Sequence, residues 1–154
     1  RIRVLLQKRS DDKDSFPGCY DCSCAGHVDA GESFISTAVR ELSEELSVKA
    51  DEAELEFLFK QRVGGEYIFY GERFANNEVN FVYLLRKHVD IGTLAFQKEE
   101  IQGLCWKDAE EVLAILRRQD AREAAGEKDV NAPGSYCIWT HEFERVFEMV
   151  KRSS

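Results

Sequence analysis

GHVDAGESFISTAVRELSEELSV, residues 26–48, joins a glycine-containing loop to a stretch with helical periodicity. Within it, Phe34, Ala38 and Leu42 recur on successive turns and form an apolar stripe that can pack against a sheet. We therefore predict an amphipathic helix from about residue 33 to residue 46.

The same predicted helix carries three glutamates on another side. Glu41, Glu44 and Glu45 stand at i, i+3 and i+4, which brings their Cβ atoms to about 5–6 Å from one another. Alone, such a cluster is typical of an acidic, solvated helix face. Here Gly26 and Gly31 precede it, and they permit unusual backbone angles before a helix N-terminus that favours anions. The combination suits a hard divalent cation together with a phosphate group.

The spacing of the charged residues also resembles a family signature. Gly26 is followed after five residues by Glu32 and after a further seven by Arg40, where the sequence continues RELSEELSV. This resembles the Nudix box, Gly-x5-Glu-x7-Arg-Glu-U-x-Glu-Glu-x-Gly-U with U aliphatic, in six of its seven invariant letters. The departure is Ser47 in place of the last glycine: Ser47 must either adopt the left-handed conformation, at a cost of about 1 kcal/mol, or the helix ends in another way.

The resemblance implies a metal site and a supporting ion pair. Mg²⁺ or Mn²⁺ would be held by Glu41, Glu44, Glu45 and the backbone carbonyl of Ala25. A structural salt bridge between Glu32 and Arg40 would tie the loop to the helix.

Hydrolysis of a diphosphate bond, in a nucleoside diphosphate linked to another moiety, is the activity that the resemblance implies. A bound cation would lower the pKa of the water that attacks phosphorus. The catalytic residues would be Glu41, Glu44 and, as candidate general base, Glu100, with Glu99 next. The loop and substrate-binding residues would be Gly26, His27, Gly31 and Glu78. Two alternatives stay open: Glu99-Glu100 also fits an exposed charged turn, and His27 a loop residue with a backbone hydrogen bond.

The flanking sequence is similar to the Nudix subgroup that contains isopentenyl-diphosphate isomerase. The similarity rests on QKRS at residues 7–10, FPG at 16–18 and DCSCAGH at 21–27. An isomerase would carry its cysteine where this chain has Ala25; Cys24 lies one residue earlier, which on a strand turns the thiol to the opposite face. Because the box carboxylates are intact, we favour a hydrolase, with the isomerase as the alternative and a non-catalytic ligand-binding Nudix domain as a third reading.

The remaining pattern predicts an α/β (α+β) fold in one domain, residues 1–154. Strands are expected at residues 2–8, 20–24, 55–63, 66–73, 78–87 and 104–106, and further helices after Asp108 and Thr140. The resemblance implies an α/β/α sandwich with a mixed sheet. The chain runs straight into a strand pattern at Arg1, which leaves open that residues precede it.

The composition favours a small molecule as the binding partner of this chain over nucleic acid or a membrane. A net charge of −8 disfavours nucleic acid, and no apolar run approaches the roughly 20 residues that cross a bilayer. Five cysteines, an odd number, fit reduced thiols in the cytoplasm rather than zinc at Cys19, Cys22 and Cys24. The resemblance leaves a homodimer open.

Overall fold

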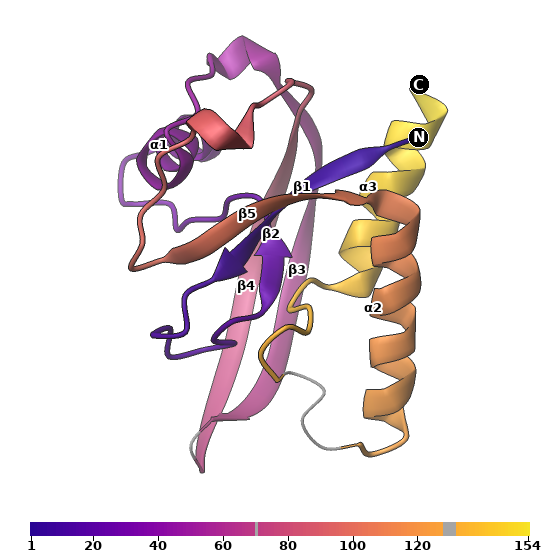
Figure 1. The fold of residues 1–154 in the computed structure, drawn as a ribbon. Coiled ribbons are helices and arrows are strands. Elements are labelled where there is room, and N and C mark those ends of the chain that lie inside the picture. Colours follow the sequence, from indigo (N-terminus) through magenta and orange to yellow (C-terminus); the bar gives the residue numbers. More distant parts are fainter. Residues whose placement is uncertain (70, 128–131) are drawn as a thin grey trace.

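Two antiparallel sheets form the centre of the computed structural model, which describes residues 1–69, 71–127 and 132–154 (Figure 1). The first sheet has the order β2-β1-β5, and its strands are β1 (Arg3–Arg9), β2 (Tyr20–Cys22) and β5 (Ile101–Asp108). The second sheet is a hairpin of β3 (Leu55–Phe69) and β4 (Glu72–Leu85). Among the described residues, the parallel contribution is a single bridge between Tyr20 and Tyr136.

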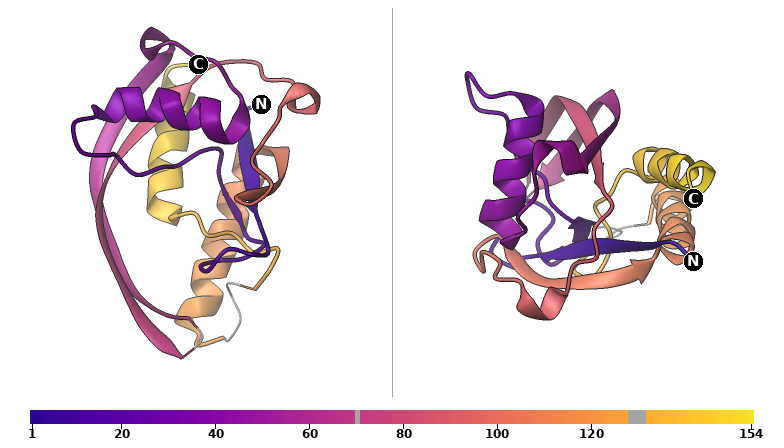
Figure 2. Two further views of the ribbon diagram at one scale, coloured as in Figure 1. Left: turned by 90° about the vertical axis from the view of Figure 1, so that its left-hand side faces the viewer. Right: turned by 90° about the horizontal axis from the view of Figure 1, so that it is seen from above.

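Helices cover the two sides of this centre. Helix α1 (Phe34–Leu46) lies on one side, and α2 (Ala109–Ala124) and α3 (Thr140–Arg152) lie together on the other, as the views in Figure 2 show. Two single turns of 3₁₀-helix are η1 (Glu52–Glu54) and η2 (Ile91–Thr93). The arrangement confirms the predicted α+β class and the layered helix–sheet–helix architecture.

The β3–β4 hairpin is longer than its sequence suggests. Separate strands were expected at residues 55–63 and 66–73, and the break between them at Gly64-Gly65 is wrong: Gly64 faces Asn77 and Gly65 faces Asn76 within the ladder. Glycine can adopt extended backbone as readily as a turn, so its presence alone does not end a strand. The ladder continues as far as the pair of Phe69 and Glu72.

Two clusters of buried side chains hold the layers together. The larger lies between β1, α2 and α3 and includes Leu6, Val112, Leu116, Phe143 and Phe147, so α3 shares its core with the rest of the chain. The smaller cluster is formed by the fully buried Leu46 and Ile101 together with Val48, and it fastens the end of α1 to β5. In the described ranges, none of the helices has the length and apolar character needed to cross a bilayer.

Candidate active site

Helix α1 has a defined beginning and end, which sets the direction of its glutamates. The Ser33 hydroxyl accepts from the Ser36 amide at 3.2 Å and the Ser36 hydroxyl accepts from the Ser33 amide at 3.2 Å, so both serines cap the first turn. At the other end Ser47 is left-handed (φ 55°, ψ 25°), as expected for the glycine position of the box. Its hydroxyl donates to the Ala95 carbonyl at 2.7 Å, a bond that glycine could not make.

Arg40 is the centre of an ion network on this helix. Its Nε and Nη2 donate to the two carboxylate oxygens of Glu32, each at 3.1 Å, which is a bidentate pair between loop and helix. The Nη1 atom lies 2.9 Å from Glu41 Oε1 and 3.0 Å from Glu44 Oε2. Hydrogen bonds from Arg40 and then Thr37 lower the pKa of Glu32, which remains charged in this network.

Gly26 brings the loop into contact with Glu41. A Cβ atom at Gly26 would stand 2.2 Å from Glu41 Cδ and 2.4 Å from Cγ, so any side chain there would displace the carboxyl group. The Glu41 side chain is only 15% exposed, held between the loop and Arg40. Gly31 has a different role, because its φ of +88° is in the left-handed region that disfavours other residues.

Cys24 and Glu45 form a second contact between the loop and α1. The Cys24 thiol donates to Glu45 Oε2 at 3.4 Å, so it faces the carboxylates, and the expectation that it points to the opposite face is wrong. The reason is that β2 ends at Cys22, and the alternation of a strand does not extend to residue 24. Burial, followed by the charge of Glu45, raises the pKa of Cys24, which keeps it a thiol.

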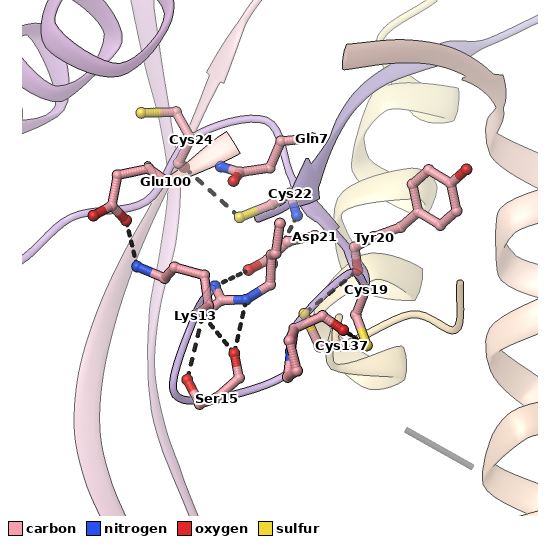
Figure 3. Close-up of polar contacts among 12 residues, drawn as sticks. Gln7, Lys13, Ser15, Cys19, Tyr20, Asp21, Cys22, Cys24, Glu100 and Cys137 are labelled. Carbon is pink, nitrogen blue, oxygen red and sulfur yellow. Dashed lines mark hydrogen bonds and ion pairs between the residues drawn. The ribbon is translucent and has the colours of Figure 1, made fainter. Parts of the chain in front are cut away.

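Glu100 joins the site from the turn before β5. Its carboxylate pairs with the ammonium group of Lys13, which comes from the loop after β1 (Figure 3). Burial raises the pKa of Glu45, and the charges of Glu41 and Glu100 raise it further. The charge of Glu100 therefore acts on Glu45 of α1, whereas the neighbouring Glu99 is exposed.

No local sequence signal distinguished Lys13 from the other basic residues near it, because its contact with Glu100 joins positions 87 residues apart. The Lys13 side chain is 27% exposed, and its charge acts on Glu45 as well as on Glu100. The site therefore includes a positively charged side chain, Lys13, that the sequence alone did not assign to it.

His27 of the loop before α1 lies close to Glu78 of β4. His27 Nε2 lies 3.6 Å from Glu78 Oε1, and the histidine side chain is 92% exposed. Glu78 belongs to β4, so this contact links the loop to the β3–β4 hairpin.

The donor chemistry of these residues suits a hard divalent cation. Glu41, Glu44 and Glu45 supply carboxylate oxygens from one helix, and Ala25 stands between the two loop residues that touch Glu41 and Glu45. In the part of the chain that is described, no three His, Cys, Asp or Glu side chains converge as closely as a bound ion requires. In this structure the Nη1 atom of Arg40 lies 2.9 Å from the Glu41 carboxylate and 3.0 Å from that of Glu44.

A family profile for the NUDIX domain matches residues 1–127. The chain belongs to the Nudix family. Nudix hydrolase 3 of Arabidopsis thaliana is 36% identical over 97% of this chain. An uncharacterised Nudix hydrolase of Yersinia pestis is 31% identical over 73% of it, and isopentenyl-diphosphate Delta-isomerase 1 of Mus musculus is 33% identical over 79%. The relatives confirm the Nudix resemblance, and the mouse isomerase among them confirms the similarity to the subgroup that contains isopentenyl-diphosphate isomerase.

This Nudix chain corresponds to only part of those relatives. It spans 18% of the Arabidopsis protein, 54% of the Yersinia protein and 56% of the mouse isomerase. Among solved structures, DR0079 of Deinococcus radiodurans matches with a TM-score of 0.52 and 24% identity, over 97% of this chain and 74% of that one. An Ap4A hydrolase of C. elegans matches with a TM-score of 0.50 and 18% identity, over 98% and 88%. These two structures support the Nudix fold.

Proposed function

We propose that this Nudix domain hydrolyses a diphosphate bond in a small molecule, a nucleoside diphosphate linked to another group, in a reaction that requires Mg²⁺ or Mn²⁺. The observation that carries the proposal is the packing of Gly26 against Glu41, beside Glu44 and Glu45 on the same helix. A loop that is tight enough to exclude a Cβ atom orients the carboxylate, and such orientation favours a defined binding geometry over a solvated acidic face.

Each residue has a separate task in the proposal. Glu41, Glu44, Glu45 and the Ala25 carbonyl would hold the cation. A bound cation supplies neutralisation of the diphosphate charge and a lowered pKa for water. Arg40 and Glu32 hold the loop against α1, and release of Glu41 and Glu44 from Arg40 would free their oxygens for the cation. Glu100 would take the proton of the attacking water, with Lys13 holding the carboxylate in place.

The test is product release from a panel of diphosphates. The panel contains nucleotide sugars, dinucleoside polyphosphates, coenzymes and isopentenyl diphosphate, assayed with MgCl₂, with MnCl₂ and with chelator. We expect cleavage that needs the cation and that falls at least about 100-fold in Glu44→Gln, while Glu110→Gln on the exposed face of α2 behaves as wild type. Absence of both cleavage and divalent-cation binding would replace the hydrolase with a ligand-binding Nudix domain.

Isomerisation is the second candidate, and the contact of Cys24 with Glu45 favours it, because a thiol beside a carboxylate could exchange protons with a bound substrate. Incubation with isopentenyl diphosphate in D₂O, followed by NMR, distinguishes the two activities. Deuterated, isomerised product without any cleavage across the panel would overturn the hydrolase proposal.

We also propose a cytoplasmic location for this domain. Cys22, Cys24, Cys105 and Cys137 are thiols, which a reducing compartment preserves.

A further inference from the structure

The two faces of the β3–β4 hairpin differ in what covers them. On one face, Gln61 donates a hydrogen bond to Glu142 of α3, and the guanidinium of Arg145 from the same helix lies 4.0 Å from the centre of the Phe59 ring. Successive residues of a strand point to opposite faces. The other face, here called the outer face, therefore carries Phe57, Lys60, Arg62, Ile68, Val79, Phe81 and Tyr83.

Aromatic and aliphatic side chains form a patch on the outer face. Phe57 and Val79 are 52% and 51% exposed. The ring centre of Phe57 lies 6.0 Å from that of Phe81 and 5.6 Å from that of Tyr83. Phe34, the first residue of α1, stacks on Phe81 with 3.6 Å between ring centres, and it is still 43% exposed. A soluble monomer rarely leaves so many neighbouring apolar side chains in water, so the patch indicates a contact surface.

Opposite charges flank this apolar patch along the hairpin. On the side of the hairpin tip, Lys60 and Arg62 are exposed, and neither pairs with a carboxylate among the described residues. At the other end η1 stops where β3 begins, so the exposed Glu52 lies beyond Phe57 at the start of the hairpin. Burial, followed by the charge of Glu52, raises the pKa of Tyr83, which agrees with this placement. The outer face is thus acidic at one end and basic at the other.

A face with this order of charges is complementary to itself. A two-fold axis through the centre of the patch would bring the aromatic rings of two copies together, and it would place Glu52 of each copy opposite Arg62 of the other. Nucleic acid fits the face less well, because Glu52 and the net charge of −8 repel phosphates. The charge pattern therefore favours a second copy of this chain as the occupant.

The size of the face sets the strength of such a contact. Between Glu52 and Arg62 it is about 30 Å long at the rise of a β-strand, and the two strands with the first turn of α1 make it about 15 Å wide. Each copy would present roughly 450 Å², or roughly 900 Å² for the pair, which is below the usual size of a permanent interface. We therefore expect reversible association.

We propose that two copies of this chain associate through the outer face of the hairpin, with Phe34, Phe57 and Phe81 at the centre and Glu52 paired with Arg62 of the other copy at each end. This inference does not depend on the proposed hydrolase function. It concerns a surface formed by the hairpin and the first turn of α1, whereas the proposed metal ligands lie at Ala25 and at residues 41–45.

Sedimentation velocity over a range of protein concentrations, from about 1 to about 500 µM, tests the proposal. The variants are Phe57→Asp, Glu52→Arg, Arg62→Glu and the double reversal of Glu52 and Arg62. Glu148→Arg is the matched control, since Glu148 is an exposed glutamate of α3 on another part of the molecule. Thermal unfolding of each variant establishes that it is folded.

We expect a wild-type dimer with a Kd between about 1 and about 100 µM. Phe57→Asp should abolish it, because a charge would be buried among aromatic rings. Each single charge reversal should weaken it at least about tenfold, since it places like charges opposite each other twice in the dimer. The double reversal should restore the Kd to within about threefold of wild type, and Glu148→Arg should not change it.

Three results would overturn the inference. A wild-type protein that stays monomeric over the whole range does so and leaves the outer face to a different partner. A dimer that Phe57→Asp leaves intact does so as well, because the contact must then lie elsewhere. A double reversal as weak as the single variants rejects the pairing of Glu52 with Arg62 and with it the two-fold arrangement. If Phe57→Asp does not fold, the charge variants at two exposed positions carry the test.

Discussion

The backbone of Gly26 lies against the carboxyl group of Glu41, where a Cβ atom would stand 2.2 Å from the carboxyl carbon. Gly26→Ala should therefore displace Glu41 and reduce kcat/KM at least about 100-fold, because a shift of about 1 Å in a positioned group can have that effect. Gly103→Ala is the control, since a Cβ atom at Gly103 in β5 meets nothing within 4 Å. Equal activity of the two variants in the diphosphate assay would contradict the assigned role of Glu41.

Glu100 and Glu99 are adjacent, yet only Glu100 pairs with Lys13 and acts on Glu45. Glu100→Gln is expected to lower kcat about 100-fold or more with little change in KM, as removal of a general base does. Glu99→Gln should remain near wild type. Steady-state kinetics of both variants would reject Glu100 as the base if the larger effect belonged to Glu99.

Cys24 separates hydrolysis from isomerisation. Its thiol is a weak donor to Glu45, so Cys24→Ala should lower hydrolysis by no more than about tenfold. An isomerase that moves protons through this thiol would lose its activity entirely. NMR of the products from isopentenyl diphosphate measures isomerisation, and a phosphate-release assay on the same sample measures hydrolysis.

Leu46 anchors the helix that carries the glutamates. It has no exposed surface, so Leu46→Ala should lower the free energy of unfolding by about 2–5 kcal/mol through lost burial and the remaining cavity. Val79→Ala, at a residue that is 51% exposed, should cost less than about 0.5 kcal/mol. Urea unfolding measures both, and similar losses would show that the end of α1 is not tightly packed.

Glu142 makes stability depend on pH in a defined direction. Burial and the charge of Asp21 raise its pKa, against the opposing effects of Gln61, Asn80 and His141. A carboxyl group whose pKa is higher in the folded state than in the unfolded state lowers the free energy of unfolding at pH values above its folded-state pKa. This loss of stability disappears as the pH falls through the folded-state pKa. Glu142→Gln should therefore be more stable than wild type at pH 7, and the difference should vanish in acid.

Thermal unfolding of wild type and Glu142→Gln between pH 4 and pH 8 checks this expectation. If wild type were more stable than Glu142→Gln at pH 7 and lost that advantage in acid, the folded state would stabilise the charged carboxylate, contrary to the direction of its pKa shift.

Helix α1 and its chemistry were predictable from sequence because they depend on local rules. Apolar residues at helical spacing set the packed face, and the spacing of Glu41, Glu44 and Glu45 then placed all three on one turn. The left-handed Ser47 was one of the two helix ends that the geometry of helix termini allows at this position. The family could be predicted for the same reason, since its signature is contained in 23 consecutive residues, 26–48.

Contacts between distant segments were decided only by the tertiary structure. Periodicity reports which face of an element is apolar, but it does not report which segment packs there or where a strand stops. The sequence therefore predicted a break at Gly64-Gly65, although the ladder continues through both residues. It also predicted that the Cys24 thiol faces away, although β2 ends at Cys22.

The sequence by itself thus determined the carboxylate helix, its ends and the Nudix family, all of which follow from short-range backbone geometry. Folding alone decided that Gly26 meets Glu41, that Lys13 meets Glu100 and that Gln61 meets Glu142. Those contacts arise because packing of the layers brings together side chains from separate elements, and no local pattern encodes that packing.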